Sequence, residues 1–181
     1  MEVGIDFKSA VDGLKSTKPV KGRMEKIPLD ECFSVIIDYA HTPDGLEKVI
    51  HTIKGFARGR VITLFGCGGD RDKSKRAIMG EISGRFSDFT VITSDNPRTE
   101  NPFLIIEDIV EGIKRTKGRF TVIIDRRKAI EYALSIADKG DIVLLAGKGQ
   151  EDYQIIGREK IPFDETEIVK AYSDGKKNEK G

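Results

Sequence analysis

The stretch "RVITLFGCGGDRDKSKRAIMGEISGRF" (residues 60–86) begins with an apolar run, continues through a glycine-rich turn and ends in a helical pattern. The run at residues 60–66 is almost entirely apolar or β-branched, which is typical of a strand covered on both faces. The segment at residues 72–86 is long enough for a helix that crosses back over the sheet. The stretch therefore predicts one β/α unit of a parallel sheet.

Four further apolar runs resemble the first, at residues 33–38, 89–94, 120–125 and 141–147. Helical patterns alternate with them, at residues 43–56, 102–114 and 126–137. Thr42 is the expected N-cap of the first of these helices, with Pro43 at its first helical position. Strict alternation implies parallel strands joined by right-handed crossovers. We therefore predict an α/β fold with a Rossmann-like, doubly wound, mostly parallel sheet flanked by helices.

The two ends of the chain depart from this alternation. Near the N-terminus, "DFKSAVDGLKS" predicts a short helix, and "TKPVKGRMEKIPLDE" predicts a loop and an edge strand. After residue 147, "DYQIIGREKIPF" predicts a hairpin that turns at Gly157, and "DETEIVKAYS" predicts a closing helix. The charged residues 175–181 are expected to form a frayed tail.

Composition excludes several classes of protein. The 181 residues suffice for one domain with its own core. A formal net charge of +1 provides no field that would attract nucleic acid or acidic lipid. Cys32 and Cys67 form no CxxC or Cys/His cluster, so we expect reduced, buried thiols rather than a disulfide or zinc site. Without a signal peptide or a long apolar segment, the sequence predicts a soluble cytoplasmic protein.

Polar or glycine-rich loops follow most of the predicted strands. They read "DYAHTPDG", "GCGGDRDKSKR", "SDNPRTE" and "GKGQED", whereas the loop "DRR" contains nothing beyond what a simple connection needs. The carboxyl ends of parallel strands lie at one edge of a sheet, where ligands bind in open α/β folds. These four loops could therefore line one crevice.

Two of the loops are glycine-rich, and neither is decisive alone. "GCGGDRD" is not a Walker A loop and lacks the third glycine of a dinucleotide fingerprint, so it indicates a phosphate site or simply a strand-to-helix turn. The loop "GKGQED" could hold a nucleotide phosphate, or Gly147 could allow close backbone approach while Glu151 accepts a charged group. The alternative is a flexible turn with solvated charges. His41 is more typical of a local hydrogen-bonding residue than of a catalyst.

The loop "SDNPR" is the more specific candidate for a ligand-binding site. Asp95 supplies an acceptor for an ammonium group, Asn96 supplies an amide, and Arg98 supplies a guanidinium fork that can pair with a carboxylate. Pro97 fixes the backbone between them. This combination suits a zwitterionic amino acid, although a simple Asx turn with proline at the helix entry would also explain it.

In their order, "GRME", "DYAHTPD", "FGCGGDRDKSKR", "SDNPRTE" and "AGKGQEDYQIIG" resemble the C-terminal domain of the Mur ligases, in the branch that adds meso-diaminopimelate. The resemblance runs from about residue 22 to the closing helix. It implies an ATP-dependent reaction in peptidoglycan precursor synthesis. A terminal carboxylate of the UDP-N-acetylmuramoyl dipeptide becomes an acyl phosphate, and the amine of the incoming amino acid attacks it.

The resemblance also implies a division of roles among the residues. The nucleotide would be faced by Arg23, Asp38 and His41. The amino acid would be held by Arg71, Asp95, Asn96, Pro97, Arg98, Gly147 and Glu151. Meso-diaminopimelate is lysine with a second carboxylate, so its distal end is a zwitterion that matches "SDNPR" and Glu151. An analogue with two zwitterionic ends, such as lanthionine, would match equally well.

One departure and several absences limit what this chain is expected to do alone. Gln150 stands where the family commonly has histidine in "GKGHE", and the sequence contains no Walker A loop. We therefore expect no catalytic or metal-binding residues here, with ATP and Mg²⁺ bound mainly elsewhere, and an inactive fragment. Residues 1–21 are interpreted as the remnant of a central domain, residues 22–174 as the amino-acid-binding domain and residues 175–181 as its tail. The alternatives are a separate module that binds diaminopimelate or peptidoglycan fragments, and a generic nucleotide-binding Rossmann protein.

Overall fold

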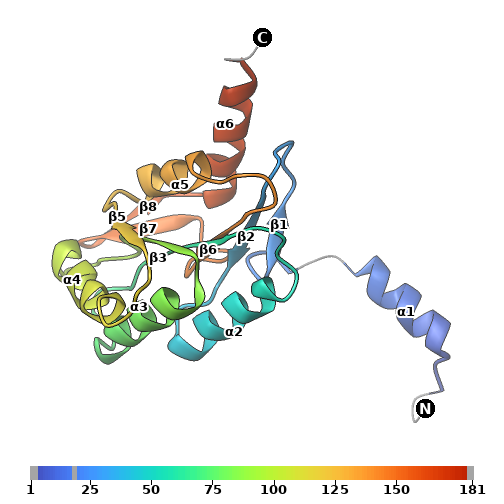
Figure 1. The fold of residues 1–181 in the computed structure, drawn as a ribbon, viewed down its shortest axis with the longest axis horizontal. Helices are drawn as coiled ribbons and strands as arrows, with labels where there is room; N and C mark the ends of the chain where they lie inside the picture. The colour runs from blue at the N-terminus through green and yellow to red at the C-terminus, as the bar shows by residue number, and fades with distance from the viewer. Residues whose placement is uncertain (1–3, 18–19, 179–181) are drawn as a thin grey trace.

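A computed structural model describes residues 4–17 and 20–178 of the chain. Its centre is a six-stranded sheet in the order β1-β2-β6-β3-β4-β5 (Figure 1). The strands are β1 (Glu25–Ile27), β2 (Ser34–Asp38), β3 (Val61–Phe65), β4 (Phe89–Ile92), β5 (Phe120–Val122) and β6 (Ile142–Ala146). Only β1 pairs antiparallel, at the edge beside β2, and the other pairings are parallel.

Helices cover both faces of the sheet. On one face, the core cluster includes apolar side chains of α2 (Pro43–Lys54), α3 (Ser74–Phe86) and α4 (Pro102–Ile113). On the other face, a second cluster includes those of α5 (Arg126–Ser135) and α6 (Glu165–Asn178). Figure 1 shows these two layers with the sheet between them. The predicted α/β, doubly wound, mostly parallel fold is therefore confirmed.

Short polar caps begin the helices close to the strand ends. The Thr42 hydroxyl accepts a hydrogen bond from the Gly45 amide at 3.2 Å, and Pro43 occupies the first turn, which confirms the predicted cap. Asn101 caps α4 ahead of Pro102 in the same way. Because each cap satisfies amides that the helix leaves unpaired, the loops between strand and cap can stay short.

The predicted element bounds differ from the structure mainly at their ends. Helix α3 begins at Ser74 rather than at residue 72, because the Asp72 carboxylate accepts hydrogen bonds from the amide and hydroxyl of Ser74 and closes a turn before the helix. Helix α6 continues to Asn178, so residues 175–178 of the expected frayed tail are helical, and residues 179–181 lie outside the described residues.

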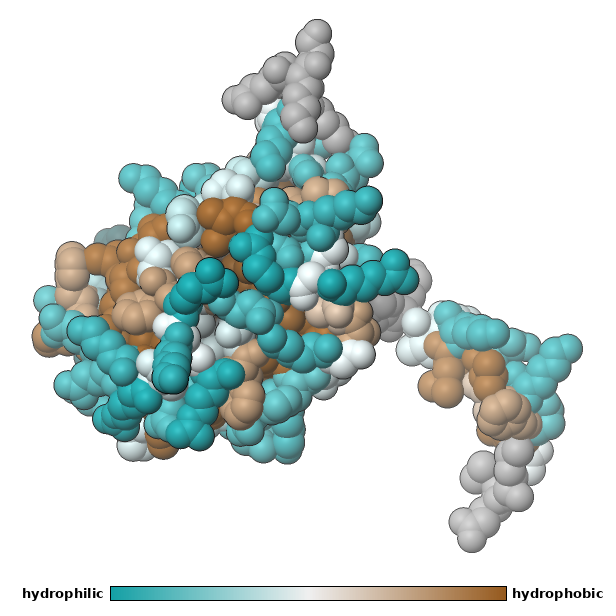
Figure 2. Space-filling view, viewed as in Figure 1, coloured by the Kyte–Doolittle hydropathy of each residue, from teal (hydrophilic) through white to brown (hydrophobic). Residues whose placement is uncertain are grey.

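The hairpin and the first helix lie outside the main sheet. Strands β7 (Tyr153–Ile156) and β8 (Glu159–Pro162) pair antiparallel and turn at Gly157, which has a φ of 61°, as predicted. Helix α1 (Phe7–Ser16) stands away from the body and buries no residue (Figure 1). Figure 2 shows apolar side chains exposed on it. Of the segment 1–21 interpreted as a remnant, residues 1–3 and 18–19 lie outside the described residues.

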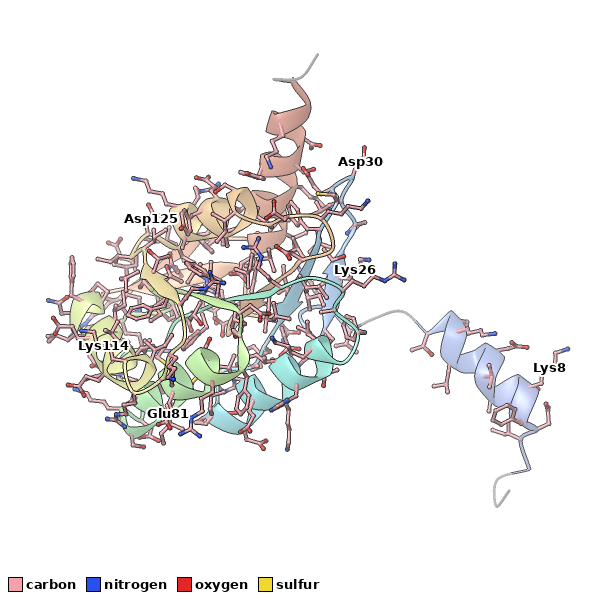
Figure 3. All side chains as sticks on the ribbon, in the orientation of Figure 1. Lys8, Lys26, Asp30, Glu81, Lys114 and Asp125 are labelled. Carbon is pink, nitrogen blue, oxygen red and sulfur yellow. The ribbon has the colours of Figure 1, made fainter. Side chains whose placement is uncertain are left out.

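Several charged side chains lie on the surface, and one thiol is exposed. Lys26, Glu81, Lys114 and Asp125 lie at the periphery of the body (Figure 3). Cys67 is buried, and burial raises the pKa of its thiol to about 12. Cys32 is exposed because it lies in the turn before β2, so the expectation that both thiols are buried was wrong. Among the described residues, no helix is long and apolar enough to cross a membrane.

Helices α3 and α4 pack at glycine contacts. A Cβ added at Gly112 would overlap the carbonyl oxygen of Ala77, and one added at Gly80 would overlap that of Ile109. Both clashes are with backbone, which cannot rotate away. The two helices therefore approach as closely as backbone allows, beneath the loops that follow β3 and β4.

Replacing Gly112→Ala should destabilise the fold by about 1–3 kcal/mol, because the added methyl group forces the two helices apart. Urea unfolding followed by circular dichroism measures this. Gly13→Ala is the matched control, since nothing lies within 4 Å of its added Cβ. Equal unfolding midpoints for the Gly112→Ala and Gly13→Ala variants would contradict the close packing.

Candidate functional site

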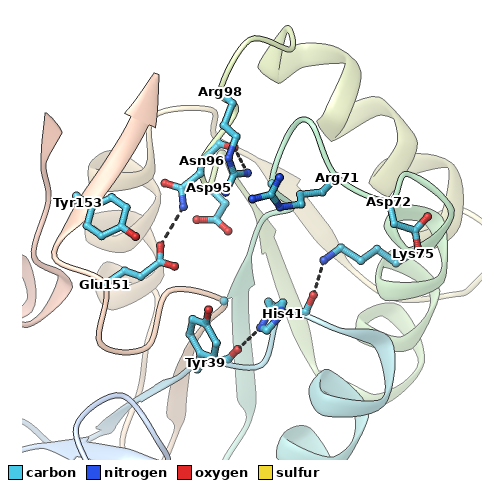
Figure 4. A pocket seen from close by; sticks show the side chains of 12 residues that line it. Tyr39, His41, Arg71, Asp72, Lys75, Asp95, Asn96, Arg98, Glu151 and Tyr153 are labelled. Atoms are coloured by element: carbon cyan, nitrogen blue, oxygen red, sulfur yellow. Dashed lines mark hydrogen bonds between the residues drawn. The ribbon is translucent and has the colours of Figure 1, made fainter. Parts of the chain in front are cut away.

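The loops at the carboxyl edge of the sheet enclose a cavity of about 410 Å³ (Figure 4). Its lining comes from the loops that follow β2, β3, β4 and β6, together with β7. The lining residues are Tyr39, His41, Gly68, Arg71, Asp72, Lys75, Asp95, Asn96, Arg98, Gly147, Glu151 and Tyr153. The structure thus brings seven of the predicted site residues into one pocket. Pro97, Arg23 and Asp38 do not line it.

Asn96 is held in one orientation by its neighbours. Its side-chain oxygen accepts hydrogen bonds from the Ile155 amide at 3.0 Å and from the Lys148 ammonium group at 3.1 Å. Its side-chain nitrogen donates to Glu151 at 2.9 Å. A primary amide nitrogen has two hydrogens, so one remains to face the pocket.

Arg98 is positioned by its backbone as well as by its side chain. Its φ of 52° lies in the left-handed region, which costs an L-residue roughly 1–2 kcal/mol. Hairpin contacts hold this conformation: the Arg98 amide donates to Ile155, and its carbonyl accepts from Gly157. One terminal nitrogen of the guanidinium donates to the Gly69 carbonyl at 2.8 Å. The hairpin and the glycine-rich turn therefore aim the guanidinium at the pocket.

Pro97 supports this arrangement from behind. It is buried, and a Cβ added at Gly69 would overlap its carbonyl oxygen. The predicted role of Pro97 as a backbone constraint fits this position, whereas direct contact with a ligand in the pocket does not.

The glycine-rich turn after β3 contributes further charge to the pocket. Arg71 is exposed and donates one hydrogen bond to the Asp70 carbonyl at 2.9 Å. Lys75, in the first turn of α3, donates to the His41 carbonyl at 2.7 Å. Figure 4 shows Arg71 lying near Asp95 and Arg98. Residues of both glycine-rich segments therefore line the pocket.

Charges of both signs balance around the cavity. The cations Arg71, Lys75 and Arg98 face the anions Asp72, Asp95 and Glu151. A pocket with one sign of charge would select an ion of the opposite sign, but this one offers partners to ammonium and carboxylate groups together. The arrangement suits a small molecule with several charges and little net charge.

Lys148 is a residue of this region that the sequence patterns did not predict. The interpretation of "GKGQED" singled out Gly147 and Glu151, yet the lysine between them is completely buried. Its ammonium group donates to the Tyr153 carbonyl at 2.6 Å and pairs with Asp95 at 3.2 Å. A lysine two residues after the end of the wholly apolar strand β6 was the available signal. Tyr39 and Tyr153, which form aromatic walls, were also missed.

The three residues expected near the nucleotide meet around Tyr39. The Arg23 guanidinium lies 4.6 Å from the centre of the Tyr39 ring, and the His41 ring centre lies 4.7 Å from it. Asp38 lies deeper, and its carboxylate accepts hydrogen bonds from the amides of Met24 and Ala40, both at 2.8 Å. Asp38 thus fixes the loop that carries Tyr39, and nucleotide binding by the three residues stays a prediction.

Buried ion pairs support the loops from below. Arg76 pairs with Glu100 and Asp108, each at 2.9 Å, and Glu100 also accepts a hydrogen bond from the Asp70 amide. Hydrogen bonding from Arg76 lowers the pKa of Glu100 to about 2. Arg126 pairs with Glu165 at 2.8 Å and donates to the Ala146 carbonyl. The expectation that "DRR" is a simple connection was therefore wrong, because Arg126 ties α5 to α6 and to the end of β6.

The glutamate ligase domain of the Mur ligases matches residues 22–149. The chain belongs to the Mur ligase family. It is 55% identical over 168 residues to the UDP-N-acetylmuramoyl-L-alanyl-D-glutamate--2,6-diaminopimelate ligase of Caldanaerobacter subterraneus subsp. tengcongensis, a match that covers 93% of this chain and 35% of that protein. The ligase of the same name from Alkaliphilus metalliredigens is also 55% identical over 168 residues, covering 93% of this chain and 34% of its own length.

A solved structure of a UDP-N-acetylmuramoyl-L-alanyl-D-glutamate--2,6-diaminopimelate ligase superposes with a TM-score of 0.82 at 39% identity. The superposition covers 97% of this chain and 36% of that one. This Mur ligase chain therefore spans about a third of the length of the relatives it matches. The resemblance found from the five ordered motifs is confirmed.

In this Mur ligase domain, Glu100→Gln should lower stability by about 1–3 kcal/mol at pH 7, because it removes a charged partner of buried Arg76. The pKa of Glu100 lies below its ordinary value of 4.5, so its contribution is present above that value and is lost as the pH falls towards 2. In urea unfolding between pH 7 and pH 2, the free energies of unfolding of wild type and Glu100→Gln should become equal in acid. Glu107→Gln, an exposed change on α4, is the control. A difference between wild type and Glu100→Gln that does not vary with pH would contradict the ion-pair account.

Proposed function

We propose that the chain is the amino-acid-recognition domain of an ATP-dependent ligase that adds meso-diaminopimelate to UDP-N-acetylmuramoyl-L-alanyl-D-glutamate during peptidoglycan precursor synthesis in the cytoplasm. The charge-balanced pocket carries the proposal, because it offers partners to both ends of a doubly zwitterionic amino acid. The printed names of the similar proteins, which are 2,6-diaminopimelate ligases, support the same substrate.

The proposed contacts follow the charges of the pocket. The Arg98 guanidinium and the remaining hydrogen of the Asn96 amide would bind the distal carboxylate of the substrate. Glu151 and the Gly147 carbonyl would accept the distal ammonium group, with Asp95 beside them. Arg71, from the glycine-rich turn, would bind the carboxylate next to the attacking amine. Each contact pairs a donor with an acceptor of opposite charge.

This arrangement would select against lysine. Lysine has no distal carboxylate, so Arg98 would lose water on binding without gaining a partner. Leaving a buried polar group unsatisfied costs ~1–3 kcal/mol, and more for a charged group. Discrimination would thus arise from a missing partner and would need no steric clash.

The remaining two thirds of the enzyme would supply the chemistry. Among the described residues, no group of three histidine, cysteine or acidic side chains could hold a metal ion. Mg²⁺ would be bound by the rest of the protein. Arg23, Asp38 and His41 would face ATP from this domain. ATP would phosphorylate the glutamate carboxylate of the dipeptide, and the amine of the amino acid would displace phosphate. This domain would hold that amine in place, and alone it would be inactive.

Titration of the ¹⁵N-labelled chain with meso-diaminopimelate should shift the amide signals of Arg71, of residues 95–98 and of Glu151. L-Lysine should bind at least about tenfold more weakly, since tenfold corresponds to about 1.4 kcal/mol. Arg98→Ala should weaken diaminopimelate binding by a similar factor and remove most of the preference over lysine. Heteronuclear correlation NMR and calorimetry measure both effects.

Arg85→Ala is the matched control, because Arg85 is an exposed arginine of α3 whose ion pair is with Glu81. It should bind diaminopimelate as the wild type does. Equal affinity for diaminopimelate and lysine in the wild type would overturn the assignment. Adding the remainder of the ligase should give ATP hydrolysis that depends on diaminopimelate, which a separate binding module would not do.

A further inference from the structure

The buried ammonium group of Lys148 is the feature of the pocket that the proposed contacts leave unused. Its side chain is 0% exposed, and it does not line the cavity. The turn that carries it is shaped by Gly147 and Gly149, with φ values of 111° and 53°. Burying a cation without partners costs several kcal/mol, so the groups around it indicate what it does.

The partners of the Lys148 ammonium group are residues that line the pocket. Apart from the Tyr153 carbonyl, the ammonium group contacts the Asn96 side-chain oxygen at 3.1 Å, an Asp95 oxygen at 3.2 Å and a Glu151 oxygen at 3.5 Å. Figure 4 shows Asp95, Asn96 and Glu151 side by side on one wall of the pocket. They come from the loops after β4 and β6, which are far apart in the chain. One ammonium group thus joins the two loops that form this wall.

Lys148 also sets the direction of the Asn96 amide. An amide can present either its oxygen or its nitrogen, and here the oxygen receives two donors, the Lys148 ammonium group and the Ile155 amide. The nitrogen is therefore left to Glu151 and the cavity. Without the lysine, one of the two donors that fix this orientation is gone.

Because Lys148 is positively charged, the wall formed by Asp95 and Glu151 suits a single cationic group of a ligand. Asp95 and Glu151 carry two negative charges, and the lysine behind them neutralises one. The net charge that remains suits one ammonium group in front. Without Lys148, two carboxylates would share this wall with no positive charge behind them, and like charges at close range repel.

We propose that Lys148 is a positioning residue for amino-acid recognition: from behind the pocket it holds Asp95, Asn96 and Glu151 in the arrangement that accepts an ammonium and a carboxylate group together. This inference rests on the proposed function. Lys148 acts through its three neighbours and touches no ligand itself.

Lys148→Met tests the proposal, because methionine fills similar space without the charge. We expect its affinity for meso-diaminopimelate to fall at least about tenfold, with most of the preference over lysine lost. Lys114→Met is the matched control. Lys114 is exposed at the end of α4 and does not line the cavity. Its affinity should stay within about twofold of wild type.

Chemical rescue separates positioning from a merely structural role. In Lys148→Ala, propylammonium can enter the space that the side chain leaves and restore the charge, so it should recover part of the diaminopimelate affinity. Propanol, of similar size but neutral, should not. Equal recovery with both compounds would mean that Lys148 only fills space, and would overturn the proposal.

A measurement on the wild type covers the case in which both Lys148 variants fail to fold. The Lys148 ammonium signal and the Asn96 side-chain amide signals should shift together as diaminopimelate is added, while the Lys114 ammonium signal does not. If the wild type binds diaminopimelate without these shifts, or if a folded Lys148→Met binds it as tightly, this inference is overturned and the proposed function stands. If the wild type does not bind, the proposed function falls as well.

Discussion

Strand β6 lies at the centre of the sheet, paired with β2 on one side and with β3 on the other. It is the last strand of this sheet in the chain, yet it separates the first parallel strand from the second. The pocket depends on this insertion, because it brings the turn at residues 147–151 between the loops after β2 and β3. Parallel pairing then places all of these loops at one edge.

Enclosed cations hold that edge in place. Arg76, Arg126 and Lys148 are each at most 1% exposed, and each pairs with a carboxylate from another segment. Buried ion pairs add little net stability, because the loss of water offsets most of the attraction. They do fix geometry, since a misplaced loop would leave a charge without a partner. The loops that line the pocket of this Mur ligase domain are therefore fixed largely by electrostatic contacts, while the apolar core fixes the sheet and helices.

The pocket offers a ligand charged groups that need partners, like those that fix the loops. Its lining supplies donors and acceptors whose partners in the protein are incomplete, as with Arg98 and the Asn96 amide. A substrate that completes these contacts gains binding free energy. A substrate that lacks one of the charged groups leaves a charged side chain of the pocket without a partner. In the function we propose, the domain recognises an amino acid by the charges at its two ends rather than by its shape.

The sequence by itself determined the architecture, because local patterns encode it. Continuous apolar runs such as residues 141–147 mark strands covered on both faces, and the Thr42 cap with Pro43 marks the start of a helix. The sequence also determined which loops matter, since "SDNPR" contains more polar groups than a turn needs. It placed seven of the predicted residues in one pocket through the rule that parallel strands end at the same edge.

Only the tertiary structure decided the partners of the buried charges. The interpretation of "GKGQED" did not single out Lys148, and "DRR", which contains Arg126, was interpreted as a simple connection. The carboxylate of Asp38 is bonded to the amides of Met24 and Ala40. The physical reason is that burial and pairing depend on segments distant in the chain: Lys148 meets Asp95 and Asn96 only because β6 lies inside the sheet, and no local pattern records that contact.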